Sequence, residues 1–503
     1  MAVFDSLFAD VLFAITALVA ILVLYVKYQR TYWQRRGVPS LPISHWLFGN
    51  AKDLFMMKRS PALLIGELHQ QGSDKDDLLG IYMFHKPFLL LRNPELIKQI
   101  LVKDFSYFPD RYFTARSFKD EIGSTNLFTI ENPQWRYVRT KVSPVFTSGK
   151  IKKIFDLIVV TADSMSKYLE QQFLDGTRTK SILIKDVALK YTTDIISSVA
   201  FGIEVNSFDP EKETFFKKTQ EGVRMTLKRG IQFAIKFFFP QISPYIGGQM
   251  LGSSTDYFRK VFWDSLDARE ASKTKRGDLI DFLIDLKNEK QETDFKFKGD
   301  ALLSQSAIFF LAGRESSVTT ICFTLYELAK NPEIQKRTRD EIREKLKEHG
   351  MTYEGVQSMK YLHQVMSETL RLYPPAPLLD RVAVENYKIP GTDIVLEKGM
   401  PVYVALCGLH RDPKYHPDPL RFNPDRFSDE NKNNMVQCTY MPFGEGPRIC
   451  IGVRLGFLQS AMALIAILKD YESSLDPTCE RDIDNLSVFI SPVDDFRIKL
   501  TKL

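Results

Sequence analysis

Residues 442–452 decide the fold, and they read Pro-Phe-Gly-Glu-Gly-Pro-Arg-Ile-Cys-Ile-Gly. Directly after this loop, residues 453–470 carry apolar side chains at helical spacing and no proline, which predicts a helix. Cys450 therefore lies at a helix N-terminus, where unpaired backbone N–H groups and the positive end of the helix dipole stabilise a thiolate. We expect its sulfur to be an anionic metal ligand.

The neighbours of Cys450 fit a large, flat group that carries the metal. Gly446 and Gly452 leave room for such a group beside the backbone, and Arg448 offers a cation to an acid on it. A buried cysteine is ordinarily a small inert side chain. That interpretation covers the remaining cysteines, Cys322, Cys407, Cys438 and Cys479. Five cysteines without CxxC spacing indicate neither a disulfide framework nor a zinc site.

The loop matches the pattern Phe-x-x-Gly-x-Arg-x-Cys-x-Gly through Phe443, Gly446, Arg448, Cys450 and Gly452. This pattern resembles that of the cytochromes P450, which are haem-thiolate monooxygenases. The resemblance implies haem b (iron protoporphyrin IX) with the Cys450 thiolate as the proximal ligand, which donates electron density so that the O–O bond of dioxygen breaks. It also implies a mainly α fold with small β-sheets. A helix-rich lobe and a smaller β lobe would hold the haem between them, behind an N-terminal transmembrane helix.

Composition is consistent with one large domain behind a short anchor. We predict a membrane anchor at residues 1–29, a basic and proline-rich linker at 30–42 and a catalytic domain at 43–503, because no low-complexity run or internal repeat divides the body. The chain has 68 basic and 62 acidic residues, and this mild net charge of +6 argues against nucleic acid as a partner.

The anchor prediction rests on an unbroken weakly polar and apolar run at residues 11–26. A cleaved signal peptide is the alternative, but the segment before the run carries Asp5 and Asp10 and no basic residue. Basic residues follow the run, at Lys27, Arg30, Arg35 and Arg36. We therefore expect an endoplasmic reticulum membrane protein of the microsomal type, with the catalytic domain on the cytoplasmic side.

Further expected haem contacts lie far from the cysteine. Trp135 and Arg139 are four residues apart, so an indole N–H and a guanidinium can point at one anion; surface packing is the alternative. In the family this pair holds a haem propionate, and Arg381 stands where relatives supply another such contact. His410 is interpreted as structural, because Cys450 already takes the proximal position.

Residues 299–330 predict one long helix that ends at Asn331-Pro332. Within it Ala312-Gly313-Arg314-Glu315-Ser316 resembles the oxygen-activation motif of the family. Ala312 would open the helix beside the haem, and Glu315 and Ser316 would relay protons. The sequence departs from the family in Ser316, where threonine is usual, and in the charged Arg314. Ser316 lacks the methyl group that fixes a threonine rotamer, so we expect more reducing equivalents to leak to peroxide or water.

A second set of charged residues has a structural interpretation. Glu368 and Arg371 share one face of a helix that ends before Pro374, and Arg426 follows at residues 424–427. Two guanidiniums around one carboxylate satisfy each other in a buried site. In the family, these three residues lock the segment that carries the cysteine loop.

The substrate pocket prediction rests on aromatic residues without helical or strand period at residues 105–118. Such residues are typical of a loop folded over a pocket, although ordinary core packing is equally consistent. The candidate pocket residues are Tyr112, Phe113, Phe118, Leu378 and Leu379. An apolar stretch at residues 231–239 is too short to cross a bilayer, and it is either core or a contact with the membrane surface.

Residues 32–39, 375–390 and 443–452 look most like insect microsomal P450s. Such enzymes oxidise a lipophilic xenobiotic, such as a plant toxin or insecticide, or an endogenous lipophile. NADPH–cytochrome P450 reductase is an expected partner, because the chain has no GxGxxG nucleotide fingerprint, and cytochrome b5 is a further candidate. The alternatives are an isomerase or dehydratase that acts on peroxides without a reductase, and a non-catalytic lipophile- or haem-binding protein. We expect a basic docking face at Lys141, Lys150, Lys152, Lys153 and Arg454, with a solvated charged surface as the alternative.

Overall fold

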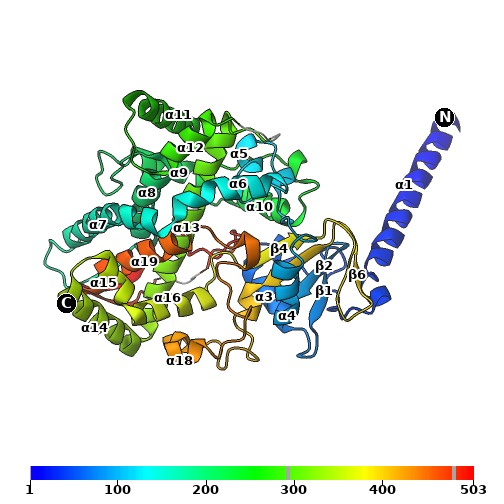
Figure 1. Cartoon of the computed structure of the whole chain (residues 1–503). Helices are drawn as coiled ribbons and strands as arrows, with labels where there is room; N and C mark the ends of the chain where they lie inside the picture. Colours follow the sequence, from blue (N-terminus) through cyan, green and yellow to red (C-terminus); the bar gives the residue numbers. More distant parts are fainter. Residues whose placement is uncertain (1, 291–294, 479–482) are drawn as a thin grey trace.

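The computed structural model describes residues 2–290, 295–478 and 483–503, so Cys479 lies outside the described residues. A helix-rich part and a smaller part built on β-sheets make up the body, and α1 projects from the sheet side (Figure 1). The helices are α1 (Ala2–Gln29), α2 (Lys52–Phe55), α3 (Pro61–Gln70), α4 (Pro94–Lys98), α5 (Glu121–Ser124), α6 (Gln134–Val142), α7 (Ser148–Gln171), α8 (Ile184–Phe201), α9 (Thr214–Val223), α10 (Leu227–Phe238), α11 (Thr255–Ser272), α12 (Leu279–Asn288), α13 (Asp300–Lys330), α14 (Pro332–His349), α15 (Tyr353–Ser358), α16 (Lys360–Leu372), α17 (Leu406–Leu409), α18 (Asp429–Lys432) and α19 (Val453–Leu468). Short 3₁₀ turns are η1 (Gln34–Arg36), η3 (Ala115–Ser117), η4 (Ser143–Phe146), η5 (Ser243–Tyr245), η6 (Gly252–Ser254), η7 (Pro424–Phe427) and η8 (Gly446–Arg448), and η2 (Gln99–Lys103) is a π-helical turn.

The strands form three small sheets. They are β1 (Leu78–Met83), β2 (Lys86–Leu91), β3 (Thr179–Ile182), β4 (Leu378–Val382), β5 (Tyr387–Lys388), β6 (Val395–Leu396), β7 (Pro401–Ala405), β8 (Tyr471–Leu475) and β9 (Ile498–Lys502). The largest sheet has the order β1-β2-β7-β4, in which β2 and β7 are parallel and the other pairs are antiparallel. Its register sets Arg381 opposite Val402, and this fixes where β4 presents its charged side chain.

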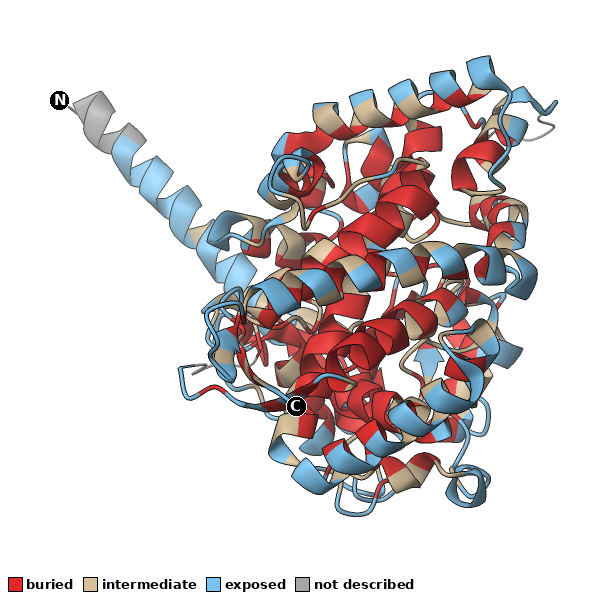
Figure 2. Cartoon of the chain, turned by 90° about the vertical axis from the view of Figure 1, so that its left-hand side faces the viewer, coloured by how far each residue is buried: buried red, intermediate tan, exposed pale blue. Residues whose placement is uncertain are grey.

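Two helices organise the core. α13 runs through the helix-rich part and packs against α8, α19 and α16. α19 is buried along nearly its whole length from Leu455 to Leu468, as expected of a helix that is apolar on all sides. Figure 2 shows this central bundle as the most continuous buried region of the molecule. The loop that carries Cys450 leads directly into α19, so the predicted metal ligand is tied to the best-packed part of the fold.

The N-terminal helix α1 stands away from the body and is exposed (Figure 2). Among the described residues, one stretch, Phe8–Arg36, is long and apolar enough to cross a membrane, and 18 consecutive residues within it have a mean hydropathy of 2.5. The segment after α1 packs on the body: Trp33 is fully buried, and its indole N–H donates to the Ile81 carbonyl at 3.3 Å. A Cβ on Gly80 would lie 2.3 Å from the Trp33 ring, so only glycine leaves space for that ring against β1.

Most expected elements occur near their expected positions. The long helix predicted at 299–330 is α13, and the apolar pieces predicted at 78–82 and 87–91 are β1 and β2. The helix expected at 94–102 is α4 followed by the π-helical turn η2. The loop at 105–118 has no long element, in agreement with its lack of period.

Candidate active site

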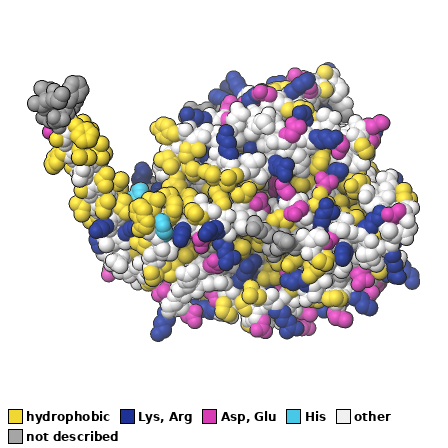
Figure 3. Space-filling view, turned by 180° about the vertical axis from the view of Figure 1, so that it is seen from behind, with side chains coloured by type: hydrophobic (Ala, Val, Ile, Leu, Met, Phe, Trp, Pro, Cys, Tyr) yellow, Lys and Arg dark blue, Asp and Glu magenta, His cyan; other side chains and the backbone are white. Residues whose placement is uncertain are grey.

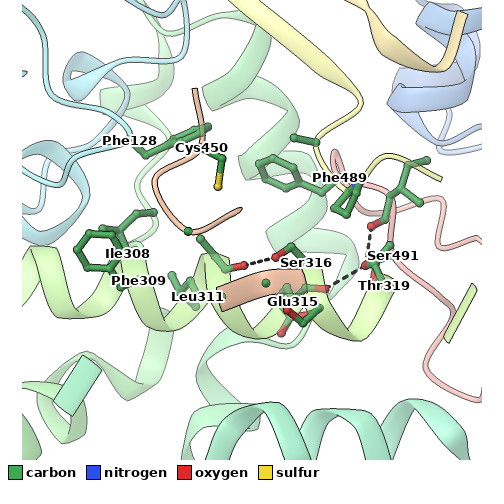
Figure 4. A pocket seen from close by; sticks show the side chains of 18 of the residues that line it. Phe128, Ile308, Phe309, Leu311, Glu315, Ser316, Thr319, Cys450, Phe489 and Ser491 are labelled. Carbon is green, nitrogen blue, oxygen red and sulfur yellow. Dashed lines mark hydrogen bonds between the residues drawn. The ribbon is translucent and has the colours of Figure 1, made fainter. Parts of the chain in front are cut away.

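A cavity of about 480 Å³ lies between α13 and the Cys450 loop. Figure 4 shows Cys450 on one side and the α13 residues Ile308, Glu315 and Ser316 on the opposite side. The predicted site residues that line the cavity are Phe113, Phe118, Trp135, Arg139, Ala312, Glu315, Ser316, Leu378, Leu379, Arg381, Phe443, Arg448, Cys450 and Gly452. Residues separated by more than 300 positions in the chain therefore meet around one space.

The backbone of the cysteine loop is tightly folded. The Cys450 N–H donates to the Phe443 carbonyl at 2.8 Å, and Gly444 and Gly446 both have positive φ angles. Gly446 does not provide the room that we expected for a flat group, because a Cβ there would lie 2.2 Å from the Leu101 carbonyl oxygen of the neighbouring segment. Gly452 fits that expectation: it lines the cavity, and a Cβ added there would meet nothing within 4 Å.

The Cys450 thiol is surrounded by protein on most sides and is exposed to the cavity. Burial raises the pKa of the Cys450 thiol, and the Gly452 backbone N–H, Arg139 and Arg111 act in the opposite direction. Within the described ranges, no group of three or more His, Cys, Asp or Glu residues could hold a metal ion. A lone thiol therefore suits a metal that arrives with ligands of its own.

A cluster of arginines occupies another wall of the cavity. Among the described residues, the carboxylates that pair with Arg111, Arg381 and Arg448 are those of Asp110 and Asp380. Burial, together with the neighbouring Arg111, lowers the pKa of Arg381 to about 9, and burial also lowers the pKa of Arg448 strongly. The Nε atoms of Arg111 and Arg381 are buried without a hydrogen-bond partner. The cluster thus fits an acidic group that would supply the missing acceptors and negative charge.

Helix α6 adds two further groups to this wall. The Trp135 ring lies 4.3 Å from the Arg448 guanidinium, and Arg139 lines the cavity one helical turn further along. Arg448 donates from Nε to the Pro109 carbonyl at 2.7 Å and from Nη2 to Asp110 at 3.2 Å. These contacts fix the Arg448 guanidinium beside the Trp135 indole, at the cavity wall to which Arg139 also belongs.

The opposite wall is the central part of α13. Ala312 is exposed to the cavity, and the Ser316 hydroxyl donates to the Ala312 carbonyl at 2.7 Å (Figure 4). The Gln459 side chain of α19 donates to the Gly313 carbonyl at 2.8 Å, so it links the helix that follows Cys450 to this segment. The arrangement sets a carboxylate and a hydroxyl across an apolar space from a single thiol.

Comparisons with known proteins agree with this geometry. The family model described as "Cytochrome P450" matches residues 39–500. The chain belongs to the cytochrome P450 family. Cytochrome P450 6k1 of Blattella germanica is 41% identical over 487 residues, which cover 92% of this chain and 91% of the relative. Probable cytochrome P450 6g2 of Drosophila melanogaster is 38% identical, with 92% of each chain covered, and cytochrome P450 6d3 of Musca domestica is 34% identical, with 98% of each covered.

Membership confirms the predicted fold class and the resemblance to insect P450s. It implies a haem held by a cysteine thiolate and an oxidoreductase that incorporates oxygen. Three features of the cavity fit a haem. Cys450 offers a thiol to the iron, the space beside Gly452 is open, and the buried Nε atoms of Arg111 and Arg381 have no acceptor among the described residues.

The predicted structural cluster of the P450 lies outside the cavity. Glu368 and Arg371 are fully buried on α16, and Arg371 donates from Nε and Nη2 to the two carboxylate oxygens at 2.7 and 2.8 Å. Arg426 Nε lies 3.4 Å from the same carboxylate, and the Asn423 backbone N–H donates to it at 2.9 Å. α16 is thereby joined to the segment that leads to the cysteine loop.

Tyr112 differs from the pocket prediction. It is not among the residues that the structure places around the P450 cavity, because its ring packs against Phe88 and Tyr403 on the large sheet. Arg111 and Phe489 line the cavity and were missed. Arg111 had a detectable signal, since Asp110-Arg111 is a charged pair inside an aromatic segment, whereas Phe489 lies in a C-terminal loop without a motif.

Proposed function

We propose that this P450 inserts one atom of dioxygen into a lipophilic small molecule, using electrons from NADPH that arrive through a separate reductase. The observation that carries the proposal is the Cys450 thiol, which faces Glu315 and Ser316 of α13 across an apolar cavity (Figure 4). A carboxylate and a hydroxyl serve proton delivery, which an oxygen-inserting reaction needs and a peroxide rearrangement does not.

Five side chains would hold a haem b in this cavity. The Cys450 thiolate would bind the iron, and the haem propionates would be bound by the cluster of Arg448, Arg381, Trp135 and Arg139. Ala312 is exposed toward the same space, and Phe443 and Gly452 border it. When bound, the haem supplies the activation of dioxygen.

Proton delivery falls to Glu315 and Ser316. The Ser316 hydroxyl donates to the Ala312 carbonyl, so it must rotate away from that acceptor before it can donate into the cavity. Serine allows this rotation readily because it lacks the methyl group of threonine. This freedom supports our expectation that Ser316 works but is less firmly oriented, with more reducing equivalents lost to peroxide or water.

The lining supports a lipophilic substrate. Aromatic and aliphatic side chains, including Phe113, Phe118, Leu378 and Leu379, surround the space in front of α13. Such walls exclude water and bind apolar surface without fixing polar groups. The proposed substrates are xenobiotics, such as plant toxins or insecticides, or endogenous lipophiles.

The redox partners are NADPH–cytochrome P450 reductase and, as a second donor, cytochrome b5. Of the basic residues proposed to dock them, Lys141 pairs with Glu289 and Lys152 pairs with Glu354. Lys153 and Arg454 are exposed, and Lys150 is half-buried. We therefore restrict the proposed docking face to Lys150, Lys153 and Arg454.

Charge reversal at Lys153 and Arg454 should raise the KM for the reductase and change the salt dependence of this KM, whereas an unchanged KM would remove these two residues from the interface.

The proposed location is the endoplasmic reticulum membrane, with residues 1–29 as anchor, 30–42 as linker and 43–503 as catalytic domain on the cytoplasmic side. Apolar side chains continue from α1 onto the adjoining face of the body (Figure 3). The segment after the linker and the segment that contains α10 both carry exposed apolar side chains, namely Trp46, Leu47, Met56, Leu227, Ile231, Ile242 and Tyr245. Ring contacts of Phe239 with Phe55 and Phe84 join these segments, which supports a membrane contact of the end of α10.

The test is turnover of a panel of lipophiles by purified protein with reductase, NADPH and isotope-labelled dioxygen, with product label read by mass spectrometry. Label that requires NADPH and is lost in Cys450→Ala supports the monooxygenase and names a substrate. Unlabelled, isomeric product formed from peroxides without NADPH would overturn the proposal in favour of an isomerase.

A further inference from the structure

Arg314, the charged residue of the α13 motif, is buried where α13 and α8 approach closely. A Cβ on the preceding Gly313 would lie 2.8 Å from Ile196 Cδ1 of α8, so the two helices are in contact at this level. Thr193 precedes Ile196 by three residues and lies on the same face of α8. The Arg314 side chain is directed into this contact, where its Nε donates to the Thr193 hydroxyl at 2.9 Å.

The guanidinium of Arg314 is paired with the Glu315 carboxylate. Its Nη1 lies 2.7 Å from Glu315 Oε1, and its Nη2 is buried with no hydrogen-bond partner in the part of the chain that the structure describes. Burial lowers the pKa of Arg314, and Glu315 and the more distant Asp186 oppose that effect. Arg314 is 0% exposed, whereas the Glu315 side chain is 43% exposed and lines the cavity. The buried positive charge of Arg314 is thus balanced by the carboxylate of Glu315, which lies at the cavity wall.

The pair also determines where the Glu315 carboxylate lies. Adjacent residues of an α-helix are about 100° apart around its axis and do not face each other. Glu315 can reach Arg314 only by bending toward the α8 side of α13. Its carboxylate is thereby held at the cavity wall, where Glu315 is one of the lining residues.

We propose that Arg314 is a positioning residue that holds the Glu315 carboxylate in one orientation at the cavity wall. This inference deepens the proposed function and rests on it for the role of Glu315 in proton delivery. Each residue of the pair depends on the other, but Arg314 depends more. Removal of Glu315 leaves the fully buried Arg314 guanidinium without its counter-ion, whereas Glu315 without Arg314 still reaches solvent in the cavity.

The first test is a thermal unfolding comparison of the haem-loaded protein with Arg314→Gln, Glu315→Gln and the double variant. We expect Glu315→Gln to lower the unfolding midpoint more than the double variant does, because only the single variant leaves a buried unpaired cation. Thr193→Val, which removes the other partner and no charge, serves as the matched control and should shift the midpoint less than Glu315→Gln. A double variant that is no more stable than Glu315→Gln would overturn the proposal.

The second test follows the Glu315 carboxylate directly, by infrared spectroscopy of protein labelled with ¹³C-glutamate at constant pH. The Glu315 carboxylate band is assigned by its loss in Glu315→Gln. This band should shift in frequency and broaden in Arg314→Gln, which removes the charged hydrogen-bond donor, and Arg314→Lys should retain a narrow band. Lys185 and Asp186 of α8 and the buried Cys322 thiol also act on this region, and they are unchanged in every variant. An unchanged band in Arg314→Gln would refute the positioning role.

Steady-state turnover shows whether a failure concerns the positioning role of Arg314 or the proposed monooxygenase function. In Arg314→Gln we expect kcat and product formed per NADPH to fall while KM stays within about twofold, with recovery in Arg314→Lys. A parallel rise in KM and unchanged kcat would contradict the proposal. If the wild-type protein does not oxidise lipophiles, the proposed function fails, yet the unfolding and infrared results still decide whether Arg314 positions Glu315.

Discussion

Replacement of Glu368 by glutamine is the sharpest test of how this P450 holds its cysteine loop. The carboxylate accepts two hydrogen bonds from Arg371, at 2.7 and 2.8 Å, and one from the Asn423 backbone at 2.9 Å. Arg426 lies 3.4 Å from it. Glutamine keeps the shape but removes the charge, so two guanidiniums lose their common counter-ion, one of them in a fully buried position.

The magnitude follows from that burial. Breaking a buried ion pair by removing one partner costs about 3–5 kcal/mol, against a total stability of about 5–15 kcal/mol for a typical protein. Because Asn423 belongs to the segment between α16 and the cysteine loop, we expect loss of this anchor to loosen Cys450 and lower haem content. The effect on haem should exceed that of any exposed ion pair nearby.

The assay is urea unfolding together with haem content per protein, read by absorbance. Asp425→Asn is the matched control: it breaks the pair of Asp425 with Arg337, at 3.0 Å, in the same segment as Arg426, but both side chains are about half exposed. That change should cost less than about 1 kcal/mol and leave haem content unchanged. Full haem content in Glu368→Gln, with the unfolding midpoint of the control, would refute the reasoning.

Three further outcomes are expected. Gly80→Ala should cost about 1–3 kcal/mol by overpacking against the buried Trp33, and limited proteolysis after α1 should become faster; unchanged proteolysis would contradict this. Burial raises the pKa of Asp194 to about 7, above its unfolded value, so its contribution to stability is present below pH 4 and is lost as pH rises toward 7. Asp194→Asn should remove that slope in unfolding measured from pH 4 to 8, and an unaltered slope would exclude Asp194. Ser316→Ala should lower product formed per NADPH, and an unchanged yield would remove the hydroxyl from proton delivery.

Local motifs predicted the parts of the site that depend on sequence spacing. Glu368 and Arg371 are one helical turn apart, so their contact follows from the helix alone. The ends of α13 were predictable for a similar reason: Gly299 has a positive φ angle before the helix, and Asn331-Pro332 follows it. The cysteine loop was predictable because its pattern is both long and specific.

The remaining features depend on contacts between distant segments. Tyr112 and Phe113 are neighbours with similar side chains, yet one packs on the large sheet and the other lines the cavity. Nothing in their local sequence distinguishes them, because the contacts that differ come from distant elements: Tyr403 of β7 packs on Tyr112, and Phe237 of α10 packs on Phe113. The surroundings of Gly446 could not be predicted from the sequence for the same reason, since the space beside it is filled by the backbone carbonyl of the distant Leu101.

The packing of Trp33 against Gly80 has a consequence for how substrates enter the enzyme. A body joined to its anchor by a loose tether would tumble and present every side to the lipid in turn. Here the segment after α1 is packed against the sheet: Trp33 is buried and its backbone N–H donates to the Tyr82 hydroxyl at 3.1 Å, which restricts the directions in which the body can turn relative to α1. We expect the tilt of α1 to set which side of the body faces the lipid. Substitutions at Trp33, remote from Cys450, should then change which molecules reach the iron and leave the rate of oxygen insertion unaltered.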